Sequence, residues 1–136
     1  MALLSWSNQY LIGSQTIDSE HQELFRLVNN FHSVWVEKHA PHDIAKILNQ
    51  LITYAEMHFR HEEEIMNAAG YPGLSEHQGI HEGMIERIFK LQQSYEDKSL
   101  HLEVDTMKFV KSWLLEHILQ EDYRFRDYLL RQKPAE

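Results

Sequence analysis

Histidine and carboxylate side chains recur on the apolar faces of four helix-forming stretches of this 136-residue chain. The short sequences EHQELF, HFRHEE, HQGIH and HILQED each place such residues in step with apolar residues three or four positions away, which is the spacing of one helical face. A buried imidazole or carboxylate without a partner is costly, so four such segments indicate that these side chains meet around metal. The candidate ligands are His21, His58, Glu62, His77, His81, His117 and Asp122.

The same periodicity predicts the fold. Apolar residues follow helical spacing through residues 19–38, 41–69, 75–95 and 100–130, and breaks such as Pro41 and the GYPG turn at residues 70–73 separate these stretches. Long amphipathic helices joined by short connections are typical of an all-α, antiparallel up-down four-helix bundle. We expect residues 1–136 to form a single domain, in which residues 1–18 are an extended N-terminal leader and residues 19–131 are the bundle.

The last predicted helix changes its register. Its apolar stripe includes Val110, Leu114 and His117 but resumes at Phe125, one position later than regular spacing requires. Asp122 lies five positions after His117, which is about 140° around an ideal helix but only about 50° if one turn widens to a π-type turn. We therefore predict a π-bulge between His117 and Asp122.

Composition limits the classes of function. The formal net charge is −8, with 13 basic against 21 acidic residues, which argues against binding of nucleic acid or of an anionic membrane surface. Because the chain has no cysteine, a metal must be bound by nitrogen and oxygen. The opening segment lacks the pattern of a secretory signal, and no apolar run reaches membrane-spanning length. We expect a monomeric protein in the cytoplasm, with no insertion into a membrane.

Ordinary explanations exist for many of these polar residues. His61 competes with His58 because they lie one turn apart, but only His58 is in phase with Glu62 and the apolar stripe. If they do not bind metal, the acidic run at residues 62–64 is a solvated helix face and Asp122 is a surface residue beside Glu121. Four further histidines lie off the stripes or near helix ends, and we expect them to be solvated: His32, His39, His42 and His101.

The number of candidate ligands implies two metal ions. Five imidazoles and two carboxylates exceed the octahedral shell of one ion. If both carboxylates bridge two ions and one solvent-derived oxygen bridges them as well, a single octahedral position stays open. Such a site suits iron, although imidazole also suits zinc, copper and nickel. Two ferrous ions with one open position can bind a small diatomic molecule, so reversible oxygen binding becomes feasible.

The chain resembles the hemerythrin family, and specifically its single-domain bacterial members, over nearly its whole length. The matching segments are Trp6 near the start, IDSEHQELF at residues 17–25, HFRHEE at residues 58–63, YP at residues 71–72, HQGIH at residues 77–81 and WLLEHILQED at residues 113–122. The resemblance implies reversible dioxygen binding at a non-haem di-iron centre, used for oxygen storage, transport or supply to an oxygen-consuming enzyme.

The resemblance also implies a role for individual residues. His77, His81 and His117 are expected to bind one iron, whereas His21 and His58 bind the other. Glu62 and Asp122 are expected to bridge the two ions together with an oxo or hydroxo group. Three residues are expected to form an apolar oxygen pocket over the open position, with ordinary helix core as the alternative reading: Trp113, Leu114 and Ile118. Such a pocket would exclude water, whose entry leaves the irons oxidised and inactive.

Other functions are compatible with the same residues. A redox enzyme acting on peroxide or nitric oxide could use the same open iron, and an oxygen sensor could act through a separate partner protein. A ferritin-like iron store or oxygenase would instead favour a carboxylate-dominated site with two Glu-x-x-His pairs. The five histidines argue against that last class, and we expect a binding protein without dedicated acid–base catalysis.

Overall fold

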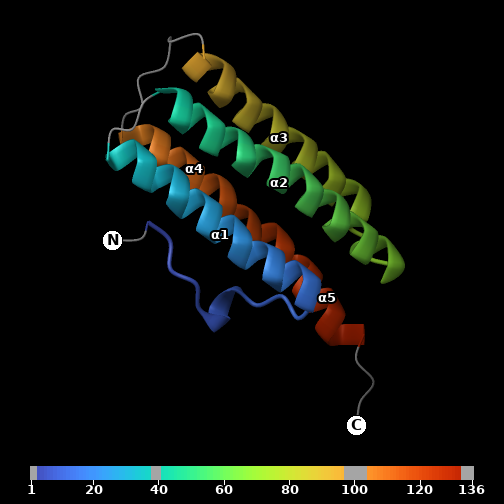
Figure 1. The fold of residues 1–136 in the computed structure, drawn as a ribbon. Coiled ribbons are helices and arrows are strands. Elements are labelled where there is room, and N and C mark those ends of the chain that lie inside the picture. Colours follow the sequence, from blue (N-terminus) through green and yellow to red (C-terminus); the bar gives the residue numbers. More distant parts are fainter. Residues whose placement is uncertain (1–2, 38–40, 97–103, 133–136) are drawn as a thin grey trace.

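The computed structural model describes residues 3–37, 41–96 and 104–132. Four long helical segments run alternately up and down and form an antiparallel bundle (Figure 1), which confirms the predicted fold class. The first three segments are α1 (Gln15–Val36), α2 (Pro41–Ala68) and α3 (Leu74–Glu96). The fourth is continuous and consists of α4 (Val104–Glu116), the π-helical turn η2 (His117–Asp122) and α5 (Tyr123–Gln132).

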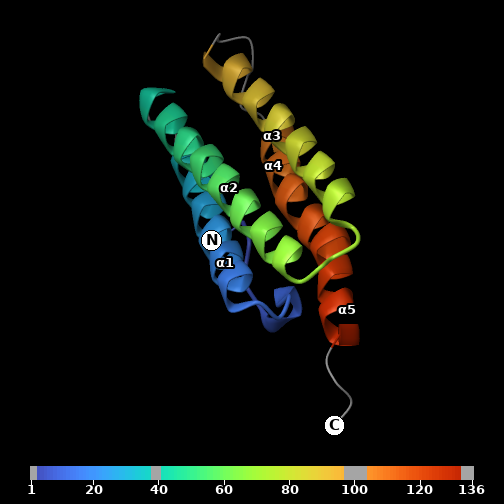
Figure 2. The ribbon, with the colours of Figure 1, turned by 90° about the vertical axis from the view of Figure 1, so that its right-hand side faces the viewer.

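The helices form a ring around a shared interior. α2 packs against both α1 and α3, and α1 also contacts α4 (Figure 2). The indole N–H of Trp113 on α4 donates to the carbonyl oxygen of Met84 on α3 at 3.0 Å, and this hydrogen bond links α3 to α4. Among the described residues, no helix is long and apolar enough to cross a membrane.

α1 begins at Gln15, not near residue 19 as predicted, because two side chains stabilise an earlier start. The Ser14 hydroxyl caps the helix by accepting a hydrogen bond from the Ile17 N–H at 3.4 Å. The buried Asp18 carboxylate accepts hydrogen bonds from the N–H groups of Ile12 at 2.7 Å and Gly13 at 3.1 Å. Gly13 has φ 103°, a conformation that glycine adopts without steric cost.

The residues before α1 lie against that helix. They include a short 3-10 helix, η1 (Asn8–Tyr10). Asn29 on α1 exchanges two hydrogen bonds with the backbone of Leu4, at 2.8 and 2.9 Å. The rings of Trp6 and Tyr10 pack on Phe25, with centroids 5.1 and 5.0 Å away. The leader therefore covers part of α1.

α2 ends in a Schellman motif that reverses the chain into α3. Gly70 has φ 69°, and its N–H donates to the Asn67 carbonyl at 3.1 Å, while the Tyr71 N–H donates to the Met66 carbonyl at 3.0 Å. The tight reversal lays the first turns of α3 beside the last turns of α2, where the segments HFRHEE and HQGIH are located.

The predicted inward stripes form the core. The stripe of α1 is fully buried at Leu24, Val28 and Phe31. The stripe of α2 is at most 1% exposed at Leu48, Leu51 and Ala55. Two residues that were predicted to point inward, Tyr95 and Met107, have side chains outside the described part of the structure. His39 and His101, which were predicted to be solvated, also lie outside the described residues.

Candidate metal centre

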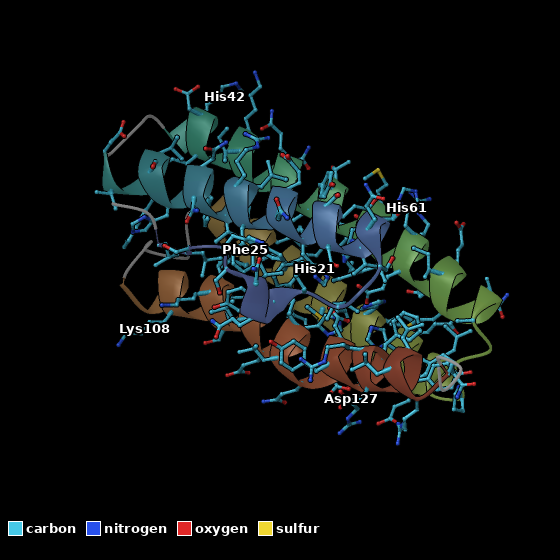
Figure 3. The ribbon with its side chains drawn as sticks, turned by 90° about the horizontal axis from the view of Figure 1, so that it is seen from below. His21, Phe25, His42, His61, Lys108 and Asp127 are labelled. Atoms are coloured by element: carbon cyan, nitrogen blue, oxygen red, sulfur yellow. The ribbon has the colours of Figure 1, made fainter. Side chains whose placement is uncertain are left out.

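The seven candidate ligands meet in the interior of the bundle. Each is at most 6% exposed. They form two groups that share Glu62, and within each group the ligand atoms lie within 4.8 Å of one another. Figure 3 shows His21 among interior side chains, whereas His42 and His61 lie toward the outer side of the bundle. The two groups are Glu62, His77, His81, His117 and Asp122, and His21, His58 and Glu62.

Glu62 turns one carboxylate oxygen toward each group. Its Oε1 lies 2.7 Å from Nε2 of His77 and 3.1 Å from Nε2 of His81. Its Oε2 lies 3.0 Å from Nε2 of His58 and 3.3 Å from Nε2 of His21. One fully buried carboxylate therefore stands between three histidines of α3 and η2 and two histidines of α1 and α2, which is the position of a bridging ligand.

Asp122 repeats this arrangement from the fourth helix. Its Oδ1 lies 3.1 Å from Nε2 of both His77 and His117, and its Oδ2 lies 3.1 Å from Nε2 of His21. The π-helical turn makes this possible. The Tyr123 N–H donates to the carbonyl of Ile118, five residues earlier, so one turn is wider than an α-helical turn. The predicted π-bulge is confirmed, and it brings Asp122 and His117 to the same face.

The donor atoms fit metal ions better than they fit one another. Both oxygens of Asp122 and the Nε2 of His58 are buried without a hydrogen-bond partner, although nitrogen or oxygen atoms of other side chains lie close by. At metal–ligand bonds of about 2.1 Å, neighbouring ligands of an octahedral ion lie about 3 Å apart. The separations of 2.7 to 3.7 Å in this cluster match that geometry. The buried histidine and carboxylate cluster can therefore hold metal ions.

The electrostatics of the centre show what a metal would replace. Burial alone would lower the pKa of His21, but the carboxylates of Asp122 and Glu62 outweigh burial and raise it to about 9. The same opposing effects raise the pKa of His77 to about 9 and that of His117 to about 10. Burial would raise the pKa of both carboxylates, yet the facing imidazoles hold it below the ordinary range. Without metal, protons supply the positive charge that the carboxylates require.

Two further carboxylates, which sequence reasoning missed, hold the outer nitrogens of the candidate ligands. Glu20 of α1 is buried, and its Oε1 lies 2.8 Å from Nδ1 of His58. Its Oε2 lies 2.6 Å from Nδ1 of the half-exposed His61, so His61 is tied to the site although it lies outside it. Glu63, expected on a solvated face, has its Oε2 2.8 Å from Nδ1 of His81. Such contacts fix the tautomer and orientation of metal-binding imidazoles.

The three residues expected to line an oxygen pocket are all buried, at 4% for Trp113, 2% for Leu114 and 0% for Ile118. They belong to the main hydrophobic core. Trp113 also lines a cavity of about 230 Å³ together with His117. The burial of Leu114 and Ile118 fits both a pocket lining and ordinary helix core, so the pocket stays a prediction.

The fold and the cluster together define a metal-binding four-helix bundle, and comparison with known proteins gives the family. Residues 12–129 match the family described as the hemerythrin HHE cation binding domain. A bacteriohemerythrin of Clostridium acetobutylicum is 30% identical over 90% of this chain and 98% of its own length. The myohemerythrin of Riftia pachyptila is 29% identical over 91% and 92%. A crystal structure of wild-type hemerythrin superposes with a TM-score of 0.84 at 28% identity, covering 93% of this chain and 97% of that one.

The chain belongs to the hemerythrin family. The match covers all seven residues of the cluster, from His21 to Asp122.

Proposed function

We propose that this protein binds dioxygen reversibly at a di-iron centre, for oxygen storage, transport or supply to an oxygen-consuming enzyme. His77, His81 and His117 would hold one iron, His21 and His58 the other, and two carboxylates would bridge them. The pair of ions would supply the two electrons and the open coordination position that dioxygen binding requires. The proposal follows from family membership and from the donor set of the buried cluster.

The placement of Glu62 and Asp122 is the observation that carries the proposal. Each presents one oxygen to the three-histidine group. The second oxygen of Glu62 faces both His58 and His21, and the second oxygen of Asp122 faces His21. A single metal ion would not require a carboxylate to face both ways. The three-to-two division of the histidines also leaves one half of the site with fewer protein ligands, where a small molecule can bind.

The remaining buried polar groups favour binding over acid–base catalysis. Apart from the seven candidate ligands, the described part of the chain buries only two charged side chains, Asp18 and Glu20. Asp18 holds the backbone before α1, and Glu20 contacts His58 and His61. Neither is left to exchange a proton with a substrate in the interior. Leu114 and Ile118, next to the site on the fourth helix, would exclude water from the open position.

An optical spectrum of the reduced, iron-loaded protein before and after exposure to air tests this function. A charge-transfer band that appears with oxygen and disappears when oxygen is removed is the expected result. Rapid turnover with peroxide or nitric oxide, without a persistent oxygen adduct, would instead assign the site to a redox enzyme. Purified protein that holds one ion or none would contradict both. Oxygen sensing through a partner, a monomeric state and a cytoplasmic location stay predictions.

A further inference from the structure

A groove between α2 and α3 reaches the metal centre from outside. It encloses about 390 Å³, and its lining is mainly apolar, with Phe59 of α2 and Ile85 and Phe89 of α3. Phe89 is 40% exposed, so its ring is accessible at the mouth of the groove. His81, one of the candidate iron ligands, also lines this groove.

Phe59 connects the groove directly to that ligand. Its ring stacks on the imidazole of His81, with centroids 3.9 Å apart and an angle of 8° between the planes. Glu63, at the edge of the same groove, contacts the outer nitrogen of His81 at 2.8 Å. A group seated in the groove is therefore separated from the metal centre by little more than one phenyl ring and one imidazole.

The edge of the groove is strongly acidic. Glu56 and Glu63 of α2 and Glu82 and Glu86 of α3 surround it, against a single basic residue, Arg60. Glu82 and Glu86 are exposed, so their charges face an approaching partner. The whole chain carries a formal charge of −8, which adds to the attraction of a basic molecule. An apolar floor within an acidic edge complements a protein whose own apolar contact patch is ringed by lysine and arginine.

A second cavity that touches the centre is less suited to this purpose. It is the cavity of about 230 Å³ that contains His117, and its lining mixes Glu116 and Glu121 with Arg87. Its charge is therefore less one-sided and its volume is smaller. The α2/α3 groove is the better candidate for a docked protein.

We propose that the α2/α3 groove docks a basic one-electron carrier protein, which returns oxidised iron to the ferrous state. This inference rests on the proposed function, because only ferrous iron binds dioxygen reversibly. In each encounter the carrier loses one electron and one iron(III) becomes iron(II), so two encounters restore one pair and no bond forms between the proteins. With the candidate ligands at most 6% exposed, the reductant acts through intervening side chains, and the stacked rings of Phe59 and His81 form such a connection on this face.

The test uses the full iron-loaded chain and two probes. Binding of a small basic c-type cytochrome is measured by titration calorimetry at low ionic strength and located by amide chemical-shift changes. Reduction of the air-oxidised protein by hexaammineruthenium(II), a cationic one-electron reductant, is followed by stopped flow. The variant Glu82→Lys/Glu86→Lys reverses the charge of the edge, and Phe89→Ser removes the exposed ring. The variant Asp43→Lys/Asp127→Lys makes an equal charge change at exposed positions of α2 and α5 that line neither the groove nor the second cavity, and it serves as the control.

We expect shift changes on α2 and α3 around the groove, and at least tenfold weaker cytochrome binding in Glu82→Lys/Glu86→Lys. Phe89→Ser should also weaken binding, and reduction by the ruthenium ion should slow severalfold in the groove charge variant but less than twofold in the control. Equal losses in both charge variants, or shift changes on another face, would overturn the inference. Self-association of the wild type that Phe89→Ser abolishes would assign the groove to a second copy and would overturn it too.

The outcomes separate this inference from the proposed function. If the wild-type protein gives no oxygen-dependent band, the proposed function fails irrespective of the groove. If the band is present in every variant but binding and reduction are indifferent to the acidic edge, only the docking surface fails.

Discussion

The metal-free protein should lose stability as the pH rises above neutrality. In the folded chain the pKa of His21 is raised to about 9 from an ordinary value of 6.5. A raised pKa contributes stability that is complete below pH 6.5 and is lost as the pH rises through about 9. A shift of this size corresponds to about 3 kcal/mol, at about 1.4 kcal/mol per pH unit. His77 and His117 act in the same direction but share the same two carboxylates, so their contributions do not simply add.

Thermal unfolding of chelator-treated protein at pH 6 and pH 9.5 measures this loss. For a chain of this size, a loss of about 3 kcal/mol corresponds to a fall in Tm of about 10 °C. The iron-loaded protein should not show the decline, because its imidazoles are neutral ligands throughout. Asp122→Asn should shrink the decline by removing a charge that raises the pKa of all three histidines. Asp127→Asn, an equivalent change at an exposed position of α5, should leave it unchanged. A Tm of the metal-free wild type that stays within about 2 °C over this range would refute the reasoning.

Three further variants probe individual parts of the site. His77→Ala should halve or abolish the bound iron measured by metal analysis, because it removes a ligand that the remaining side chains cannot replace. Glu20→Gln and Glu63→Gln should each weaken metal binding about 10- to 100-fold in chelator competition, since they hold His58 and His81 through their outer nitrogens; Glu64→Gln, at an exposed position of α2, should have no effect. Leu114→Ser should keep its iron but speed the decay of the oxygen adduct followed optically, and an unchanged decay rate would contradict its role as a pocket lining.

Periodicity predicted most of what lies inside a single helix. The apolar stripe of α2 separated His58 from His61 without any knowledge of the neighbouring helices, and the structure buries the first and leaves the second half-exposed. The slip of register in the fourth helix predicted the π-helical turn for the same reason, since the slipped apolar stripe and the widened turn lie on the same helix. The position of a residue along a helix determines the direction of its side chain, so the spacing of residues in the sequence predicts which side chains point inward.

Contacts between helices could not be predicted in this way. Glu20 stands off the stripe of α1, and its role depends on the approach of α2, which brings Nδ1 of His58 to 2.8 Å. Glu63 was expected in solvent because its neighbour Glu62 is the residue in phase, yet α3 brings His81 against it. The early start of α1 likewise depends on the fold of the chain before it, where Asp18 meets the backbone of Ile12. A single sequence carries no signal for these pairings.

The distribution of charge in the bundle explains why one set of side chains can serve both folding and metal binding. Glu62 and Asp122 are fully buried, and without positive charge nearby their ionised forms would be strongly destabilised. In the metal-free chain, protons on His21, His77 and His117 provide that charge, whereas in the loaded protein metal ions do. Metal binding therefore displaces protons from these imidazoles, which must be neutral to act as ligands. The acidic edge of the α2/α3 groove is different in kind, because its exposed residues Glu82 and Glu86 face solvent, where their charge is available to a partner.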